Sequence, residues 1–499
     1  MIVLGNGNLR LGFDGRTGAL VSLLNLATGD EYLKQAGPDG GLFRILMGQT
    51  QPYTYKADPA NLGGTSVTPR DCRLLGRQFT TDFQGGLLRL TLESPAGLRI
   101  ELSVRMPHDD VTADCGITVT NEGPEATTAL TTFPHLGGLQ LGEDAGTNLA
   151  VHLTHWGWSG EGAGVPAWDW SGGIYGGTLS TAVMQWGGVW EPSLDEGLGL
   201  IIMDPETREK FIWRGPNPGR MWVLYIPEEA LEPGQTRSYP PARLLVHRGN
   251  WQVTATRYRD WFRRNFRVRR PPSWLDEVDM SGFATLPVPE HVHAAIAGDK
   301  EAPPRDPRRI ALAQQVRTFR DLPRALVDPV NEGFDHFELW AYYTQVVKSG
   351  NIHPGYTLSD ALFVPRPDLG GAAALRRAVD TAHRLGRRVT LYMCVPWVDG
   401  FAESNVVDEV GRRWTVMGPG GTISRYKYRD GLMACPGSRE VQEHFAQVCK
   451  RLLWETGADG LRLDTFGTMS YTPCYNPEHH HPSPFGWNQW IRTFLRRVR

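Results

Sequence analysis

Residues 438–465, SREVQEHFAQVCKRLLWETGADGLRLDT, predict a helix that runs directly into a strand. Ser438 can cap a helix over 439–456, and Gly457 can end it. The residues from 459 to 465 then alternate between polar and apolar, as in a strand. A helix that leads into a strand is the repeating unit of parallel sheets, so this stretch predicts an α/β domain.

The same alternation of strands and helices extends through the second half of the chain. Strands are predicted at 281–287, 337–343 and 388–395, and helices at 307–322 and 370–386. No Gly-rich dinucleotide loop follows any of these strands, and charged and aromatic residues gather at their C-terminal ends. We therefore predict a (β/α)8 barrel over residues 278–499 rather than a doubly wound sheet.

The length of this domain sets a further expectation. Residues 278–499 number 222, near the ~250 of a complete barrel, but only four strand–helix units are recognisable. The chain also stops within an apparent helix, GWNQWIRTFLRRVR. We therefore expect about the first half of a barrel, and a compact irregular α/β domain is the alternative.

The first half of the chain has a different pattern. Over residues 1–248, short alternating runs separated by Gly, Asp, Asn and Pro predict one large antiparallel β-sandwich with no long helix. A helix over 250–266, which Asn250 can cap, and the sequence Arg-Arg-Pro-Pro at 269–272 follow it. We take 249–277 as the link between the two domains.

Composition excludes several classes of protein. The 499 residues carry 52 Lys+Arg and 54 Asp+Glu, a net charge of −2, which gives no basic surface for nucleic acid or an anionic membrane. A hydrophobic content of 40% excludes a disordered chain. No apolar run reaches the ~18 residues of a membrane span, and we see no signal peptide. We expect a cytoplasmic protein without nucleic-acid or membrane partners.

Aromatic residues are unusually dense between residues 152 and 190. This segment holds six of the 17 Trp, among them Trp186 and Trp190. Indole faces stack on sugar rings, so the segment predicts a carbohydrate platform. The other interpretation, which the usual burial of large aromatic side chains favours, is that these rings pack the sandwich against the next domain.

The strand at 459–465 carries the sharpest candidate for chemistry. Alternation places Gly460, Arg462 and Asp464 on one face, which is the interior of a barrel. A guanidinium beside a carboxylate favours the ionised form, and an ionised carboxylate at a strand end can attack an anomeric carbon. The alternative is a buried structural ion pair.

Glycoside hydrolysis requires a second carboxyl group. Asp399 follows the third strand and Glu338 lies on the second, so either can be the acid/base, or the acid/base belongs to strands beyond these four. Aromatic residues on or near the strand ends can form walls that stack on sugar, although core packing is the better explanation of each one taken alone; they are Trp340, Tyr342, Tyr343, Tyr392 and Trp397.

The segment after Asp464 contains Cys474, His479 and His481. These residue types bind zinc, but the spacing C-x4-H-x-H is not a standard zinc pattern, and no fourth ligand is spaced with it. We expect no metal or other cofactor, and we predict instead that His479 and His481 bind sugar hydroxyls. The alternative is that these histidines are polar residues of a loop and bind nothing.

Three segments carry a resemblance to a known family. They are Tyr175–Gly-Gly-Thr with Gln185 and Gly199–Asp204, Met433-Ala-Cys435-Pro436 with Ala458–Asp464, and Cys474–Pro482. The chain resembles an uncharacterised bacterial group of glycoside-hydrolase-like proteins with a galactose-mutarotase-like β-sandwich and a TIM barrel. It is similar to retaining α-glycosidases such as α-galactosidases, α-glucosidases and endo-α-N-acetylgalactosaminidases.

The resemblance implies particular roles for residues of this chain. Asp464 falls where these enzymes carry the fourth-strand nucleophile, and Gly460-x-Arg462-x-Asp464 is similar to the fourth-strand motif of α-amylases, in which the Arg supports the nucleophile. The acid/base of the α-galactosidase-like enzymes lies on the sixth strand, which this sequence does not present.

These observations favour a retaining glycoside hydrolase acting on α-linked oligo- or polysaccharide, with a carbohydrate as its partner. A non-catalytic carbohydrate-binding protein, or an inactive glycosidase fragment, is the second hypothesis, since the aromatic residues do not require an acid/base pair. A metal-dependent hydrolase that uses the Cys/His segment is the third.

Overall fold

A computed structural model describes most of the chain. The described residues are 1–35, 41–48, 64–127, 129–151, 163–167, 171–175, 184–215, 219–225, 230–286, 316–346, 352–354, 361–395, 397–399, 413–423, 431–464 and 473–498. They divide into two compact units, Met1–Val268 and Arg269–Arg499, and each unit is described by itself.

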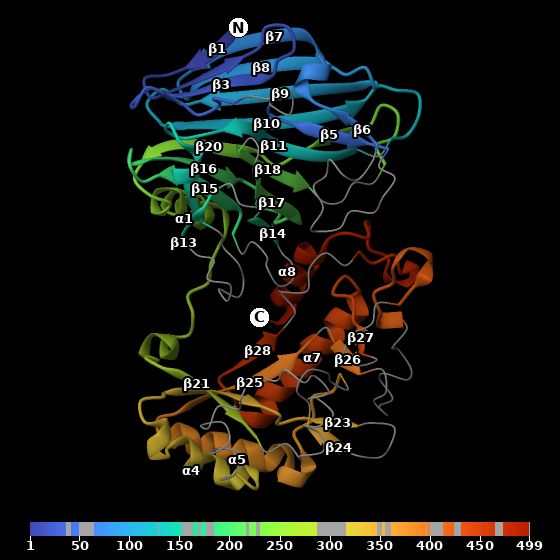
Figure 1. The fold of residues 1–499 in the computed structure, drawn as a ribbon. Coiled ribbons are helices and arrows are strands. Elements are labelled where there is room, and N and C mark those ends of the chain that lie inside the picture. Colours follow the sequence, from blue (N-terminus) through green and yellow to red (C-terminus); the bar gives the residue numbers. More distant parts are fainter. Residues whose placement is uncertain are drawn as a thin grey trace. The chain divides into compact units, whose positions relative to one another are not determined.

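The first unit is built from antiparallel sheets (Figure 1). Within the described residues, one sheet has ten strands, in which β19 (Thr236–Ser238) pairs with β10 beside the main path. The order along that path is β13 (Ala163–Pro166), β12 (Leu149–Val151), β15 (Trp186–Glu191), β16 (Glu196–Ile202), β20 (Ala242–Arg248), β10 (Thr112–Asn121), β9 (Leu98–Met106), β8 (Gly85–Glu93) and β7 (Arg73–Asp82).

Two smaller sheets complete the described strands of this unit. The first contains β1 (Ile2–Gly5), β2 (Leu9–Phe13), β3 (Leu20–Asn25) and β4 (Asp30–Glu31) in chain order. The second has the order β14 (Ser171–Tyr175), β17 (Lys210–Gly215), β18 (Gly219–Tyr225), β11 (Ala129–Leu139), β5 (Arg44–Met47) and β6 (Thr65–Val67).

The core of the first unit lies between these sheets. Residues that alternate along the strands turn one side chain inward and the next outward, so each sheet presents an apolar face. Leu102, Ile117 and Leu244 of the ten-stranded sheet share one buried cluster with Phe133 and Val223 of the six-stranded sheet. The described antiparallel sheets and their shared core agree with the β-sandwich predicted for this half.

Helix α1 (Gln252–Asn265) belongs to the first unit. Asn250 accepts a hydrogen bond from the Gln252 backbone N–H at 2.9 Å, as its capping role required. Tyr258 and Trp261 are buried on one side of the helix and pack against β15 and β16. The predicted linking segment is therefore divided, because its helix packs on the sandwich and the division between units falls after Val268.

The second unit contains a parallel sheet. Its four strands, β21 (Ser281–Thr285), β22 (His336–Trp340), β25 (Arg388–Cys394) and β28 (Gly460–Asp464), are neighbours in chain order within the described residues. This is the order of strands along a (β/α)8 barrel wall. The parallel α/β region that the sequence predicted is confirmed.

Helices cover one face of this sheet (Figure 1). Helix α5 (Gly371–Arg384) connects β22 to β25, and α7 (Arg439–Thr456) connects β25 to β28. Before them lies the short α4 (Leu322–Leu326), and α8 (Trp487–Val498) comes last. Their buried side chains form one core with the strands, including Leu339, Leu391, Leu375, Val379, Phe445 and Leu452.

The ends of α7 follow the sequence signals. Ser438 accepts a hydrogen bond from the Val441 N–H, and Gly457 adopts the left-handed conformation with φ 68° that closes the helix. The predicted helix over 307–322 differs: residues 307–315 lie outside the described part, and the chain from 319 forms a 3₁₀ turn, Phe319–Asp321, and then α4.

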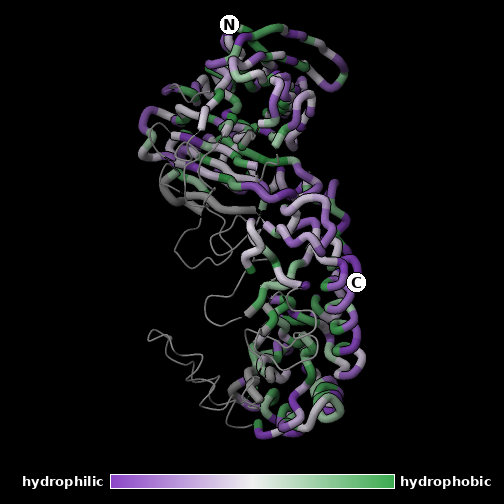
Figure 2. The backbone as a smooth tube through the Cα atoms, turned by 90° about the vertical axis from the view of Figure 1, so that its right-hand side faces the viewer, coloured by the Kyte–Doolittle hydropathy of each residue, from purple (hydrophilic) through white to green (hydrophobic). Residues whose placement is uncertain are grey.

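Two short antiparallel pairs lie outside the parallel sheet, β23 (Thr344–Val346) with β24 (Ile352–Pro354) and β26 (Trp397–Asp399) with β27 (Gly431–Met433). Hydrophobic and hydrophilic stretches occur in both units, as amphipathic strands and helices require (Figure 2). Among the described residues, no helix is long and apolar enough to cross a membrane.

Candidate active site at the end of the parallel sheet

Strand β28 carries the two residues that the sequence singled out. Its parallel register with β25 pairs Tyr392 with Arg462 and Cys394 with Asp464, the last residue of each strand. Leu461 and Leu463 pack against the helix-covered core. Arg462 and Asp464 therefore share the opposite face of the sheet, as the alternation predicted.

Arg462 joins two carboxylates. Its Nη1 donates to Glu338 Oε1 at 2.9 Å, and its Nη2 donates to Asp464 Oδ1 at 3.3 Å. Burial opposes the charge of the guanidinium, but the hydrogen bond and charge of Glu338 and the charge of Asp464 outweigh it and raise the pKa of Arg462. Arg462 thus remains a cation between two anionic partners.

Tyr392 is the second donor to Asp464. Its phenol donates to Asp464 Oδ2 at 2.7 Å, so both carboxylate oxygens accept a hydrogen bond from this face of the sheet. Burial raises the pKa of Tyr392 far above its usual range, and the negative charge of Asp464 acts in the same direction. The phenol therefore keeps the proton that it donates.

An aromatic layer supports these groups. The rings of Trp340 and Tyr392 stack with centroids 4.1 Å apart, and the Arg462 guanidinium lies 5.6 Å from the Trp340 ring and 5.8 Å from the Tyr392 ring. Phe283 meets Trp340 edge to face at 5.8 Å and is half exposed. Such cation–π contacts restrict where the guanidinium can lie.

Glu338 is held within this network. It is buried, with 8% of its surface exposed, and the indole N–H of Trp340 donates to the same Oε1 that accepts from Arg462. Both donors bind one oxygen of this carboxylate and hold it beside the Arg462 guanidinium. The geometry favours a role for Glu338 in positioning Arg462.

The predicted aromatic walls have mixed outcomes. Trp340 is half-buried in the layer just described. Tyr343 has no exposed surface and packs against Phe363 at 4.8 Å, which makes it a core residue and argues against a sugar wall. Trp397 and Asp399 lie on β26, and their side chains lie outside the described part of the structure.

Two indoles of the platform expected in the first unit are core residues instead. Trp186 and Trp190 expose 3% and 8% of their surfaces. They form a cluster with Tyr258 and Trp261 of α1, and Trp186 stacks on Trp251 at 6.3 Å. Because helix α1 covers them, these indoles stabilise the helix–sheet packing and offer no free face to a sugar. Residues 152–162, 168–170 and 176–183 of this aromatic segment lie outside the described residues.

The structure places one further residue beside the Cys/His segment, which the sequence did not connect with it. Cys435, 39 residues before Cys474, lies with Cys474, His479 and His481 in one group. The hydrogen bond from Cys435 lowers the pKa of the Cys474 thiol, and the bond with His479 adds to this effect against the opposing effect of burial. Burial raises the pKa of Cys435.

Comparison with solved structures identifies the fold. The α-N-acetylgalactosaminidase NagBb from Bifidobacterium bifidum, in complex with GalNAc, matches with a TM-score of 0.68 and 14% identity, over 99% of this chain and 75% of that one. The chain shares the fold of α-glycosidases. The GH36 α-galactosidase AgaA from Geobacillus stearothermophilus matches with a TM-score of 0.56 and 11% identity, over 100% and 70% of the two chains.

A second α-galactosidase from the same organism, AgaB, matches with a TM-score of 0.55 and 12% identity, over 99% of this chain and 69% of that one. A family model described as a domain of unknown function, DUF6259, matches residues 362–499. No curated protein matches the sequence. The structural similarity to α-galactosidases that the sequence indicated is confirmed, and at these identities it is a similarity of fold.

Proposed function

We propose that this protein is a glycoside hydrolase that cleaves α-linked oligo- or polysaccharide with retention of configuration, with Asp464 as the nucleophile. The observation that carries the proposal is the arrangement of Asp464. It stands at the C-terminal end of a parallel strand, where barrel enzymes keep their active sites, and its two oxygens accept hydrogen bonds from Arg462 and Tyr392.

The chemistry follows from this arrangement. One Asp464 oxygen forms a bond to the anomeric carbon as the bond to the leaving oxygen breaks, and the leaving oxygen takes a proton from a second carboxyl group. Water then attacks the glycosyl ester, returns a proton to that group and frees the Asp464 carboxylate. Two fixed donors, Arg462 and Tyr392, orient the attacking oxygen.

The other residues of the network have supporting roles in this proposal. Arg462 and Tyr392 hold the nucleophile, and Glu338 positions Arg462 through the 2.9 Å ion pair. Trp340 contributes an aromatic surface beside them. The reaction also requires a second carboxyl group as acid/base. Asp399, which follows β25 in the chain, is the candidate that this sequence offers for that role.

The similar folds indicate which substrates to test first. The solved structures are named for the release of α-linked galactose and N-acetylgalactosamine. Aryl α-galactosides and aryl α-N-acetylgalactosaminides are therefore the first members of a panel of aryl α-glycosides.

Asp464→Asn tests the proposal. The amide keeps the shape of the side chain but cannot attack carbon, so we expect kcat/KM to fall by about 10⁴-fold or more, as for the loss of a catalytic group that acts in a unit. The matched control is Asp380→Asn on α5, which removes an exposed carboxylate paired with Arg376 at 3.0 Å and should leave kcat/KM unchanged.

Two outcomes contradict the proposal. Equal activity of Asp464→Asn and the wild-type protein excludes Asp464 as nucleophile. Sugar binding by calorimetry without aglycone release from any member of the panel assigns the protein to the non-catalytic carbohydrate-binding class instead.

A further inference from the structure

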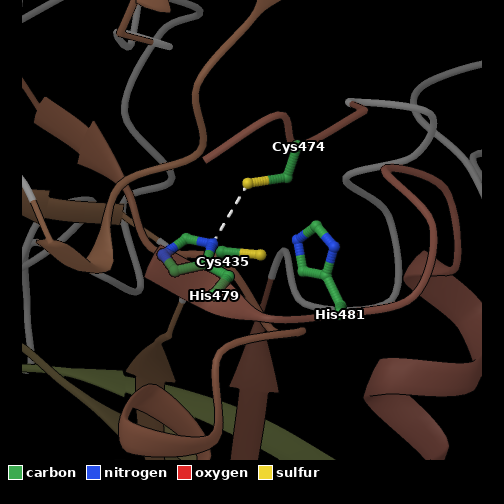
Figure 3. Close-up of side chains that lie close together, drawn as sticks. All are labelled: Cys435, Cys474, His479 and His481. Carbon is green, nitrogen blue, oxygen red and sulfur yellow. Dashed lines mark hydrogen bonds between the residues drawn. The ribbon is translucent and has the colours of Figure 1, made fainter. Parts of the chain in front are cut away.

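Four metal-binding side chains from separate segments converge in the second unit. Cys435 follows β27, and Cys474, His479 and His481 follow β28 (Figure 3). One ligand atom from each lies within 4.8 Å of all the others. Both cysteines have no exposed surface, and His479 exposes 7%. Two sulfurs and two nitrogens are thus gathered away from water.

His479 is oriented by the backbone. Its Nε2 lies 2.7 Å from the carbonyl oxygen of Arg413, which only accepts hydrogen bonds, so Nε2 carries the proton and donates. Its Nδ1 then faces Cys474 Sγ at 3.1 Å. A histidine that donates one ring N–H to a carbonyl and turns the other nitrogen to the site is the usual arrangement of a metal ligand.

The other ligands are also held in place. The backbone N–H of Gly437 donates to Cys435 Sγ at 3.3 Å. The His481 ring stacks on Trp490 of α8 at 4.5 Å, and a Cβ at Gly437 would lie 2.7 Å from that indole. The close approach of Gly437 therefore lets the backbone, the imidazole and the indole pack together.

One polar atom of the group lacks a partner. His481 Nε2 is buried and makes no hydrogen bond, although its ring faces the two sulfurs (Figure 3). A buried nitrogen without a partner costs ~1–3 kcal/mol, and such a group requires an explanation. A ligand at the centre of the cluster supplies one.

We propose that Cys435, Cys474, His479 and His481 bind one zinc ion in tetrahedral geometry. Two thiolates and two imidazoles are the ligand set of a structural zinc site. Zinc–sulfur and zinc–nitrogen bonds of ~2.3 and ~2.0 Å place the ligand atoms ~3.3–3.8 Å apart, so the largest separation here has to close by only about 1 Å. Zinc binds cysteine as thiolate, so a thiol that still carries its proton releases it to solvent on binding.

Four protein ligands leave no open coordination position, which makes this a structural site rather than a catalytic one. This argues against the metal-dependent hydrolase that the sequence left open. The ion instead ties Cys435, four residues before the start of α7, to the segment that follows the strand of Asp464. Both ring nitrogens of His479 already have protein partners, which argues against its predicted contact with sugar. In this proposal His481 binds zinc instead of sugar.

Elemental mass spectrometry of the full chain, purified without chelator, measures its metal content and tests the proposal. We expect one zinc per chain, and cobalt(II) in its place should show the intense visible absorption of a tetrahedral thiolate site. His481→Asn and Cys435→Ser should lose the metal. The matched control is His480→Asn, because His480 is exposed between the two ligands and its φ of 52° suits Asn.

A variant that fails to fold is replaced by a measurement on the wild-type protein. A strong chelator should lower its melting temperature, and added zinc should restore it, which does not depend on any enzymatic activity. The proposal is overturned if the purified protein contains no metal and neither the chelator nor added zinc changes its melting temperature. So does a Cys435–Cys474 disulfide in the purified protein, or retention of zinc by His481→Asn.

Discussion

At the scale of single residues, the proposed chemistry depends on the groups that surround one carboxylate. Asp464 accepts from Arg462 at 3.3 Å and from Tyr392 at 2.7 Å, and Arg462 is itself held by Glu338. Alternation along one strand was enough to predict the first contact. The contacts with Tyr392 and Glu338 depend on the register of β28 against β25 and of β25 against β22, which a single sequence does not specify.

Tyr392 leads to a prediction about pH. Because burial raises its pKa far above the ~10 of a free tyrosine, the native protein keeps this proton where exposed tyrosines lose theirs. Above about pH 10 the unfolded chain binds fewer protons at this residue than the folded chain, so its contribution to stability falls as the pH rises.

Spectrophotometric titration of tyrosinate checks this expectation. The curves of wild-type protein and Tyr392→Phe should coincide up to the pH at which the protein unfolds. A wild-type curve that contains one additional tyrosine ionising near pH 10 would show that the phenol is not held in the protonated state.

At the scale of elements, local signals predicted the boundaries well and the partners poorly. Ser438 and Gly457 delimit α7 where expected, since caps depend on neighbouring residues. Trp186 and Trp190 were predicted to be a sugar platform, but aromatic density does not reveal that a later helix covers them. Cys435 was missed for a similar reason. Cys435 and Cys474 are 39 residues apart in the sequence, and no spacing pattern connects them.

The contact between α1 and the sandwich gives a prediction at this scale. A Cβ at Gly199 on β16 would lie 2.3 Å from Thr254 Oγ1, and Thr254 on α1 has no exposed surface. Gly199→Ala should therefore push the helix from the sheet and destabilise the protein by about 1–3 kcal/mol.

Denaturant unfolding monitored by the fluorescence of the Trp cluster measures this effect. Gly76→Ala on β7 is the matched control, because a Cβ there meets nothing within 4 Å and the stability should stay within ~0.5 kcal/mol of wild type. Equal stability of the two variants would mean that α1 does not rest on Gly199.

At the scale of the whole molecule, the order of architectures was predictable and their internal topology was not. Period-2 runs followed by strand–helix repeats predicted antiparallel sheets and then a parallel sheet, and both are present. The strand order of the ten-stranded sheet, which places β20 beside β10 and β16, depends on long-range pairing that leaves no local signal. The similarity of fold to α-glycosidases covers 99% of the chain, with 14% identity to the first of them.

The most direct test of the central claim is to trap the glycosyl ester. A fluorinated, activated α-glycoside that forms this ester faster than water hydrolyses it should label the full chain, and peptide mass spectrometry then locates the sugar. We expect one sugar per chain on Asp464, and no label on Asp464→Asn. A label on another carboxylate, or turnover of α-glycosides without any label on Asp464, would contradict it.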